Sequence, residues 1–134
     1  MRAAAMAVLS GLVLAACGSR QEVAVEDAAR SFAEALASDD LERACTSLAP
    51  STVVELETST GQACARALQA QDVVVLDEVG SIQRYGRQAS VEVQSSPGET
   101  DTWFLSRFDG RWLLVAAACT PRPELPYDCD VEGP

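Results

Sequence analysis

The chain has 134 residues, with 20 acidic and 10 basic side chains, and its formal net charge at pH 7 is −10. This charge excludes nucleic-acid binding, which requires clustered basic side chains that displace counterions. It also predicts that electrostatic attraction does not hold the chain on anionic lipid. The sequence contains neither Lys nor His, which excludes Schiff-base, Ser–Lys and His-dependent catalysis and His-ligated metals.

The N-terminus has the three parts of a secretory signal. Residues 1–2 carry a positive charge, residues 3–14 are apolar, and small residues then lead to Cys17. The 14 residues 3–16 are too few for a transmembrane helix, which needs about 20. Cleavage at an ordinary signal-peptidase site is the alternative, but the Ala-x-Ala at residues 3–5 lies at the start of the apolar stretch, whereas a cleavage site must follow that stretch. The boundary sequence, Leu14-Ala15-Ala16-Cys17, instead looks like a bacterial lipobox.

A lipobox here implies that residues 1–16 are a lipoprotein signal peptide and that a diacylglyceryl group is attached to Cys17. Two acyl chains give stable membrane binding, whereas one gives only marginal binding. We therefore expect a protein lipid-anchored at the cell membrane, on its outer (extracytoplasmic) face, with membrane lipid as a partner. Residues 17–23 are expected to be the lipidated cysteine and a short extended tether of at most about 20 Å. Residues 24–134 are expected to form a single domain.

Apolar residues recur at helical spacing from about Ala24, which predicts a first helix. Asp39 and Glu42 have the spacing of a capping box and predict the start of a second helix, which Pro50 is expected to end. The remaining predicted helices cover residues 52–56 and a short segment that follows a cap at Ser59 and Gln62.

After Asp72 the apolar period changes to two, which predicts strands. Asp109-Gly110 is a strong signal for a two-residue hairpin loop. The predicted strands cover residues 79–85, 89–93, 101–108 and 111–119, after an extended segment at 73–76, with turns at 86–87 and 96–99.

The predicted hairpin has two apolar faces. With Asp109-Gly110 as its loop, Leu105 lies opposite Leu114 and Trp103 lies opposite Ala116. We therefore expect helices to cover one face and a curled sheet or enclosed pocket to account for the other. The first face carries Trp103, Leu105, Trp112 and Leu114, and the second carries Phe104, Phe108, Leu113 and Val115.

This order of elements predicts an α+β fold, with N-terminal helices packed on a curved antiparallel β-meander of about four strands.

Lipidation of Cys17 would leave an even set of four cysteines, which are expected to be oxidised outside the cytoplasm. Of the three connectivities, we favour the two local bridges Cys45–Cys64 and Cys119–Cys129. A zinc site is the alternative, but the sequence offers neither a Cys-x-x-Cys pair nor a His.

The chain also resembles a group of small, uncharacterised actinobacterial lipoproteins, and its element order is similar to the nuclear transport factor two-like superfamily. This resemblance implies a cone of curved sheet closed by helices, often around a pocket. Members of the superfamily include isomerases, dehydratases and non-catalytic modules, so the fold does not define a function. The residues that carry the resemblance are Ala44-Cys45, Leu48-Ala49-Pro50, Cys64, Tyr85-Gly86, Ala89-x-Val91, Asp109-Gly110-x-Trp112, Cys119-Thr120-Pro121 and Pro126-Tyr127-Asp128-Cys129.

Carboxylates are the remaining candidates for catalysis, and we interpret them as solvated surface groups. A weak calcium site at Asp128-x-Asp130-x-Glu132 is an alternative, but Ca²⁺ needs six or more oxygen ligands and this loop supplies few. We therefore predict no catalytic residues, no cofactor and no metal. The carboxylates considered are Asp39, Asp40, Glu55, Glu57, Asp77, Glu78, Asp128, Asp130 and Glu132.

Two hypotheses for the function follow. The first is a non-catalytic binding or interaction module, tethered to the membrane, whose partner is an unknown envelope protein or a small apolar ligand. The second is a small carboxylate-dependent enzyme that acts on an envelope metabolite in the pocket of the cone. The missing catalytic residue types favour the first hypothesis.

Overall fold

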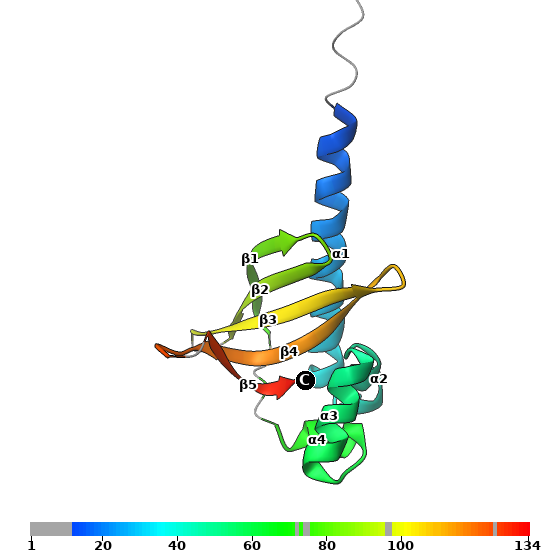
Figure 1. Cartoon of the computed structure of the whole chain (residues 1–134), viewed down its shortest axis with the longest axis vertical. Coiled ribbons are helices and arrows are strands. Elements are labelled where there is room, and N and C mark those ends of the chain that lie inside the picture. The colour runs from blue at the N-terminus through cyan, green and yellow to red at the C-terminus, as the bar shows by residue number, and fades with distance from the viewer. Residues whose placement is uncertain (1–11, 72, 74–75, 96–97, 125) are drawn as a thin grey trace, which may run out of the picture.

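The computed structural model describes residues 12–71, 73, 76–95, 98–124 and 126–134. Within these residues, four helices precede a five-stranded antiparallel sheet whose strands are ordered as in the chain, β1-β2-β3-β4-β5 (Figure 1). The predicted α+β class is therefore confirmed. The sheet also has a fifth strand that the sequence did not predict.

Helix α1, Leu12–Ala37, is longer than expected. The predicted start was Ala24, and residues 18–23 were expected to be extended, but the helix includes them. Extending an existing helix costs little compared with nucleating one, and Arg20, Gln21 and Glu22 are good helix formers. Six helical residues span about 9 Å, less than half of their extended length. The buried face of α1 carries Val25, Ala29, Phe32 and Ala33.

Three short helices follow: α2, Leu41–Thr46; α3, Pro50–Thr60; and α4, Cys64–Gln69. The predicted helix boundaries at Asp39 and Pro50 differ from the observed ones. The N-cap of α2 is Asp40, whose side chain accepts a hydrogen bond from the backbone N–H of Arg43 at 3.2 Å, whereas Asp39 lies in a turn with φ of 56°. Pro50 begins α3, since a proline at the first helical position needs no N–H.

Helix α4 forms where it was expected, but the predicted cap at Ser59 and Gln62 is wrong. The N-cap residue is Ala63, which has no side-chain hydrogen bond to offer. The carboxylate of Glu57 on α3 instead accepts a hydrogen bond from the backbone N–H of Cys64 at 2.9 Å. A neighbouring helix thus supplies the acceptor that a local cap usually provides.

The strands are β1, Glu78–Tyr85; β2, Gln88–Ser95; β3, Glu99–Phe108; β4, Arg111–Pro121; and β5, Tyr127–Glu132. Four of them match the predicted strands. The predicted extended segment at 73–76 includes residues 74–75, which lie outside the described part, and the turn at 96–99 likewise includes residues 96–97.

The hairpin between β3 and β4 has the predicted loop and the predicted register beside it, from the pair Phe108 and Arg111 to the pair Leu105 and Leu114. Asp109 and Gly110 both have positive φ, and Leu105 pairs with Leu114 as expected. Beyond Leu105 the register shifts, so Ala116 pairs with Phe104 and not with Trp103. The predicted pairing of Trp103 with Ala116 is therefore wrong, because irregularities of the β-bulge type displace β4 relative to β3.

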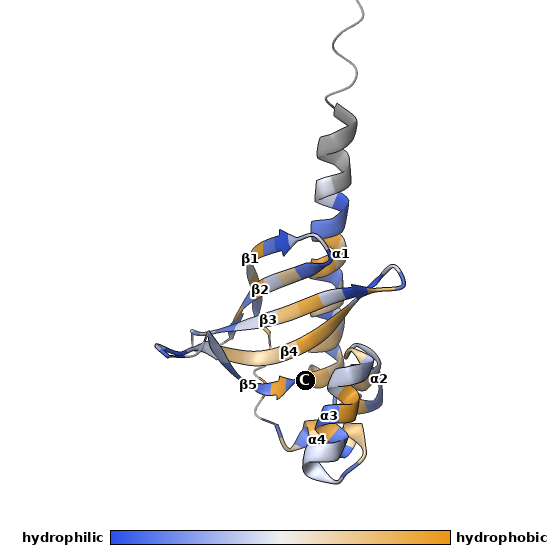
Figure 2. Ribbon diagram, in the orientation of Figure 1, coloured by the Kyte–Doolittle hydropathy of each residue, from blue (hydrophilic) through white to orange (hydrophobic). Residues whose placement is uncertain are grey.

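Helix α1 covers one face of the sheet, where the core lies (Figures 1 and 2). The rings of Phe32 on α1 and Trp103 on β3 meet edge to face, with centroids 5.3 Å apart, and both side chains are fully buried. Alternate residues of β2 complete this layer, which confirms the predicted strand periodicity. They are Ala89, Val91 and Val93.

Both favoured disulfides are formed. Cys45–Cys64 joins α2 to α4, and Cys119–Cys129 joins paired positions on β4 and β5, where the two Cα atoms are 4.0 Å apart. The zinc alternative is wrong, because all four of these sulfur atoms are used in bridges.

Candidate functional site

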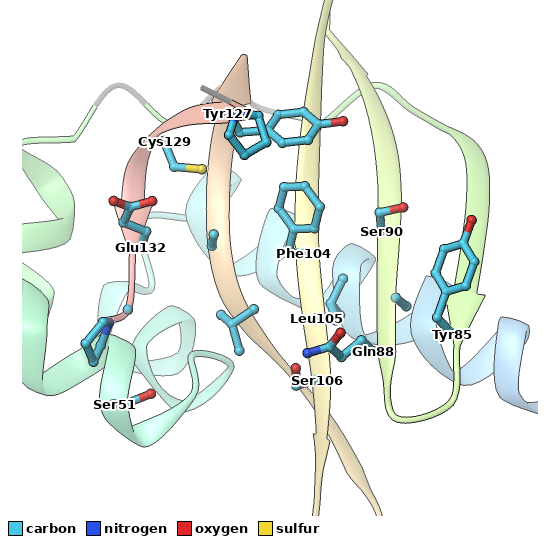
Figure 3. Close-up of a pocket in the computed structure, with 16 residues that line it drawn as sticks. Ser51, Tyr85, Gln88, Ser90, Phe104, Leu105, Ser106, Tyr127, Cys129 and Glu132 are labelled. Atoms are coloured by element: carbon cyan, nitrogen blue, oxygen red, sulfur yellow. The ribbon is translucent and has the colours of Figure 1, made fainter. Parts of the chain in front are cut away.

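The sheet face opposite α1 carries a pocket of about 500 Å³ (Figure 3). It draws residues from all five strands, from the start of α3 and from the last residues of the chain. The side chains that define it are Tyr85, Gln88, Ser90, Phe104, Ser106, Tyr127 and Glu132, with Ser51 at its border.

Aromatic rings form its apolar part. Phe104 lies between Trp103 and Leu105, which are buried under α1, so strand alternation turns the Phe104 ring to the opposite face. The ring of Tyr127 on β5 meets it edge to face, with centroids 4.8 Å apart. Tyr85 on β1 is 71% exposed, and its hydroxyl donates a hydrogen bond to the Gln83 side chain at 3.1 Å. The pocket is therefore bordered by tyrosines from the two outer strands.

The position of Tyr127 depends on how β5 is held. Cys129, two residues along the strand, is bonded to Cys119 on β4. At the far end, the backbone N–H of Gly133 and the hydroxyl of Thr52 both donate to the carbonyl of Val115, each at 3.0 Å. A Cβ at Gly133 would lie 2.9 Å from the Thr52 hydroxyl oxygen, so this approach requires glycine.

Polar groups in the pocket are few and mixed. Gln88, Ser90 and Ser106 offer neutral donors and acceptors. Glu132 is exposed, and it supplies the one side-chain carboxylate among the described lining residues. A mostly apolar pocket with a few polar groups is typical of sites that bind small molecules.

The carboxylates considered from sequence are not brought together here. Asp40 and Glu57 cap helices, Glu55 is exposed on α3, and Asp77 and Glu78 lie at the start of β1. Only Glu132 reaches the pocket. None of the others therefore has a second group with which to share catalytic work at this site.

A second pocket, of about 380 Å³, contains two of the three acidic residues of the calcium alternative, whereas the third, Glu132, lines the first pocket. The second pocket is lined by Asp128 and Asp130 together with Glu99 and Asp101 of β3. Asp128 forms an ion pair with Arg122. In the part of the chain that the structure describes, no group of three or more acidic, Cys or His side chains is arranged to hold a metal ion. The calcium alternative gains no support from this arrangement.

Comparisons with protein-family models, curated proteins and solved structures found no match. Among the described residues, no helix has both the length and the hydrophobicity needed to cross a membrane.

Proposed function

We propose that this protein is a membrane-anchored extracytoplasmic lipoprotein whose domain is a non-catalytic binding module. The supporting observation is the pocket opposite α1, where Phe104 and Tyr127 present a paired aromatic surface. Its volume of about 500 Å³ lies within the range of sites for small molecules, about 300–1,000 Å³. A small apolar ligand with one or two polar groups fits this lining best.

The proposed location rests on separate observations. Leu14-Ala15-Ala16-Cys17 resembles a lipobox, and the remaining four cysteines are paired, as is usual in oxidising compartments outside the cytoplasm. The cone of the nuclear transport factor two-like superfamily is proposed as the fold family. Helices followed by an antiparallel meander support it, as does a pocket on the sheet face that the helices leave open.

Glu132 favours the second candidate, a carboxylate-dependent enzyme acting on an envelope metabolite, because it places an acid in the pocket. The two candidates differ in what Glu132→Gln does. A binding module keeps its affinity for an apolar ligand, whereas an enzyme of this kind loses turnover when its only pocket carboxylate is neutralised.

Binding is tested with the neutral fluorescent probe N-phenyl-1-naphthylamine, whose emission rises in apolar sites. We expect saturable binding to the disulfide-bonded chain, weakened about tenfold by Phe104→Ser or Tyr127→Ser. Val54→Ser is the control, because Val54 is a hydrophobic residue, 62% exposed on α3, outside the pocket. Equal affinity in all four proteins would refute the pocket assignment.

Anchoring is tested independently. Cys17→Ser is expected to stay uncleaved and to lose its acyl chains, which mass spectrometry detects. A mutant that is still processed and lipidated would refute the anchor without affecting the pocket.

A further inference from the structure

One end of the sheet is basic, although the chain as a whole is acidic. The turn between β1 and β2 and the hairpin between β3 and β4 lie at this end, because successive strands are antiparallel. At this end of the sheet, Arg87 and Arg107 are joined by two hydrogen bonds. The Arg107 N–H donates to the Arg87 carbonyl at 2.9 Å, and the Arg87 guanidinium donates to the Arg107 carbonyl at 2.8 Å.

The N-terminal part of α1 reaches the same end. The indole N–H of Trp112 donates to the Gln21 side chain at 3.2 Å, and Trp112 pairs with Arg107 in the sheet. Arg20, adjacent to Gln21, is exposed. We define the basic end as Arg20, Arg84, Arg87, Arg107 and Arg111.

The charges of the basic end are not neutralised locally. The ion pairs found in the described part of the chain use other arginines, namely Arg30, Arg43 and Arg122. Only two acidic residues, Glu22 and Asp109, lie within two positions of any arginine of the basic end in the sequence. Counted with these two sequence neighbours, the five arginines carry a formal charge of +3.

The opposite end of the sheet is acidic. The turn between β2 and β3 lies there, and the second pocket gathers Glu99, Asp101, Asp128 and Asp130 beside it. Charge is therefore segregated along the strands. The net charge of −10 is an average over a surface that includes a positively charged region. The expectation that the chain is not attracted to anionic lipid, which was drawn from net charge alone, therefore does not apply to the basic end.

We propose that the basic end docks on the anionic phospholipid headgroups of the membrane that holds Cys17. This inference rests on the proposed lipid anchor. Cys17 lies four residues before Gln21 on the continuous helix α1, which is about 6 Å along its axis. Electrostatic attraction extends about 10 Å at 0.1 M salt, and arginine pairs with phosphate through two parallel hydrogen bonds.

Docking at the basic end also determines where the pocket lies relative to the membrane. Tyr85 at the pocket border lies between Arg84 and Arg87 in the chain. Docking of the basic end therefore brings the Tyr85 side of the pocket close to the headgroup layer, where a small apolar ligand leaving the bilayer can reach it.

The test uses the full lipidated chain in vesicles of neutral phosphatidylcholine, with or without anionic phosphatidylglycerol. Flotation of the protein with the vesicles first verifies the anchor. The arginines are then modified with phenylglyoxal, and the rate of modification at each arginine is measured by mass spectrometry. We expect phosphatidylglycerol to slow the modification of Arg87, Arg107 and Arg111 by roughly three- to fivefold at about 0.1 M salt. At about 1 M salt we expect this protection to disappear.

Arg43 and Arg66, exposed on α2 and α4, are internal controls whose rates are expected to stay unchanged. The double variant Arg87→Gln, Arg111→Gln is expected to lose most of the protection at Arg107, whereas Arg43→Gln, Arg66→Gln keeps it. Equal rates at the basic end in both kinds of vesicle, with flotation intact, would overturn the docking while leaving the anchor standing. A chain that does not float overturns the anchor itself, and the docking with it.

Discussion

The two faces of the sheet are both apolar, but they are packed very differently. Under α1, Trp103 is fully buried and meets Phe32. On the other face, Phe104 is half-buried and meets Tyr127, itself 37% exposed, beside the pocket. Adjacent residues of one strand therefore belong to a closed core and to an open surface.

This difference shows that apolar alternation on both faces of a strand does not require two packed layers. An exposed apolar surface in a small domain commonly marks a binding site, because it costs free energy in water and is retained where something covers it. If the second face is the proposed binding surface, substitutions at neighbouring positions of one strand affect stability on one face and ligand binding on the other.

The largest effect on stability is expected at Trp103. Trp103→Ala removes a fully buried ring and leaves a cavity, which is expected to lower the free energy of unfolding by about 3–5 kcal/mol. Phe104→Ala is expected to cost about 1 kcal/mol, because its ring is half-buried and its main contact is one aromatic pair. Urea unfolding of the oxidised proteins measures both. Equal losses would mean that the second face is packed as tightly as the first.

The two disulfides differ in their distance from the pocket. Removing either bridge by Cys→Ser pairs is expected to cost about 3 kcal/mol on the chain-entropy model. Only the loss of Cys119–Cys129 frees β5 beside the pocket and is expected to weaken probe binding as well. The Cys45–Cys64 bridge lies between helices, so its removal is the control. Equal probe affinities in the two double variants would show that the bridge does not position Tyr127.

Local signals determined how much of this fold was predictable. The Asp109-Gly110 loop specified its own register as far as Leu105 and Leu114, because a two-residue loop directly fixes the pairs beside it. The register shift beyond Leu105 depends on the packing of β4 as a whole, and no local sequence signal predicts it. Pairing of the cysteines was predictable because the favoured partners are close in sequence.

The fifth strand was missed, although a signal for it exists. Tyr127, Cys129 and Val131 alternate with acidic residues, which is the pattern of a half-buried strand. The prolines that precede this segment favoured a loop instead. Without β5, Tyr127 had no predictable position, so the pocket remained only one explanation for a second apolar face. Tyr85 and Glu132 were likewise beyond prediction, because the pocket assembles residues from strands that are distant in the sequence.

The smallest effect is expected where α1 meets the closed face near its N-terminal part. Trp112 donates its indole N–H to Gln21 there, and Trp112 also belongs to the apolar core, so a single substitution at Trp112 would disturb packing as well as the hydrogen bond. The contribution of the hydrogen bond is therefore isolated by a double-mutant cycle of Trp112→Phe and Gln21→Leu, read by urea unfolding. We expect a coupling free energy of about 1 kcal/mol. A coupling near zero would mean that apolar packing alone holds this part of α1, and that the hydrogen bond to Gln21 does not fix Arg20 near the other arginines of the basic end.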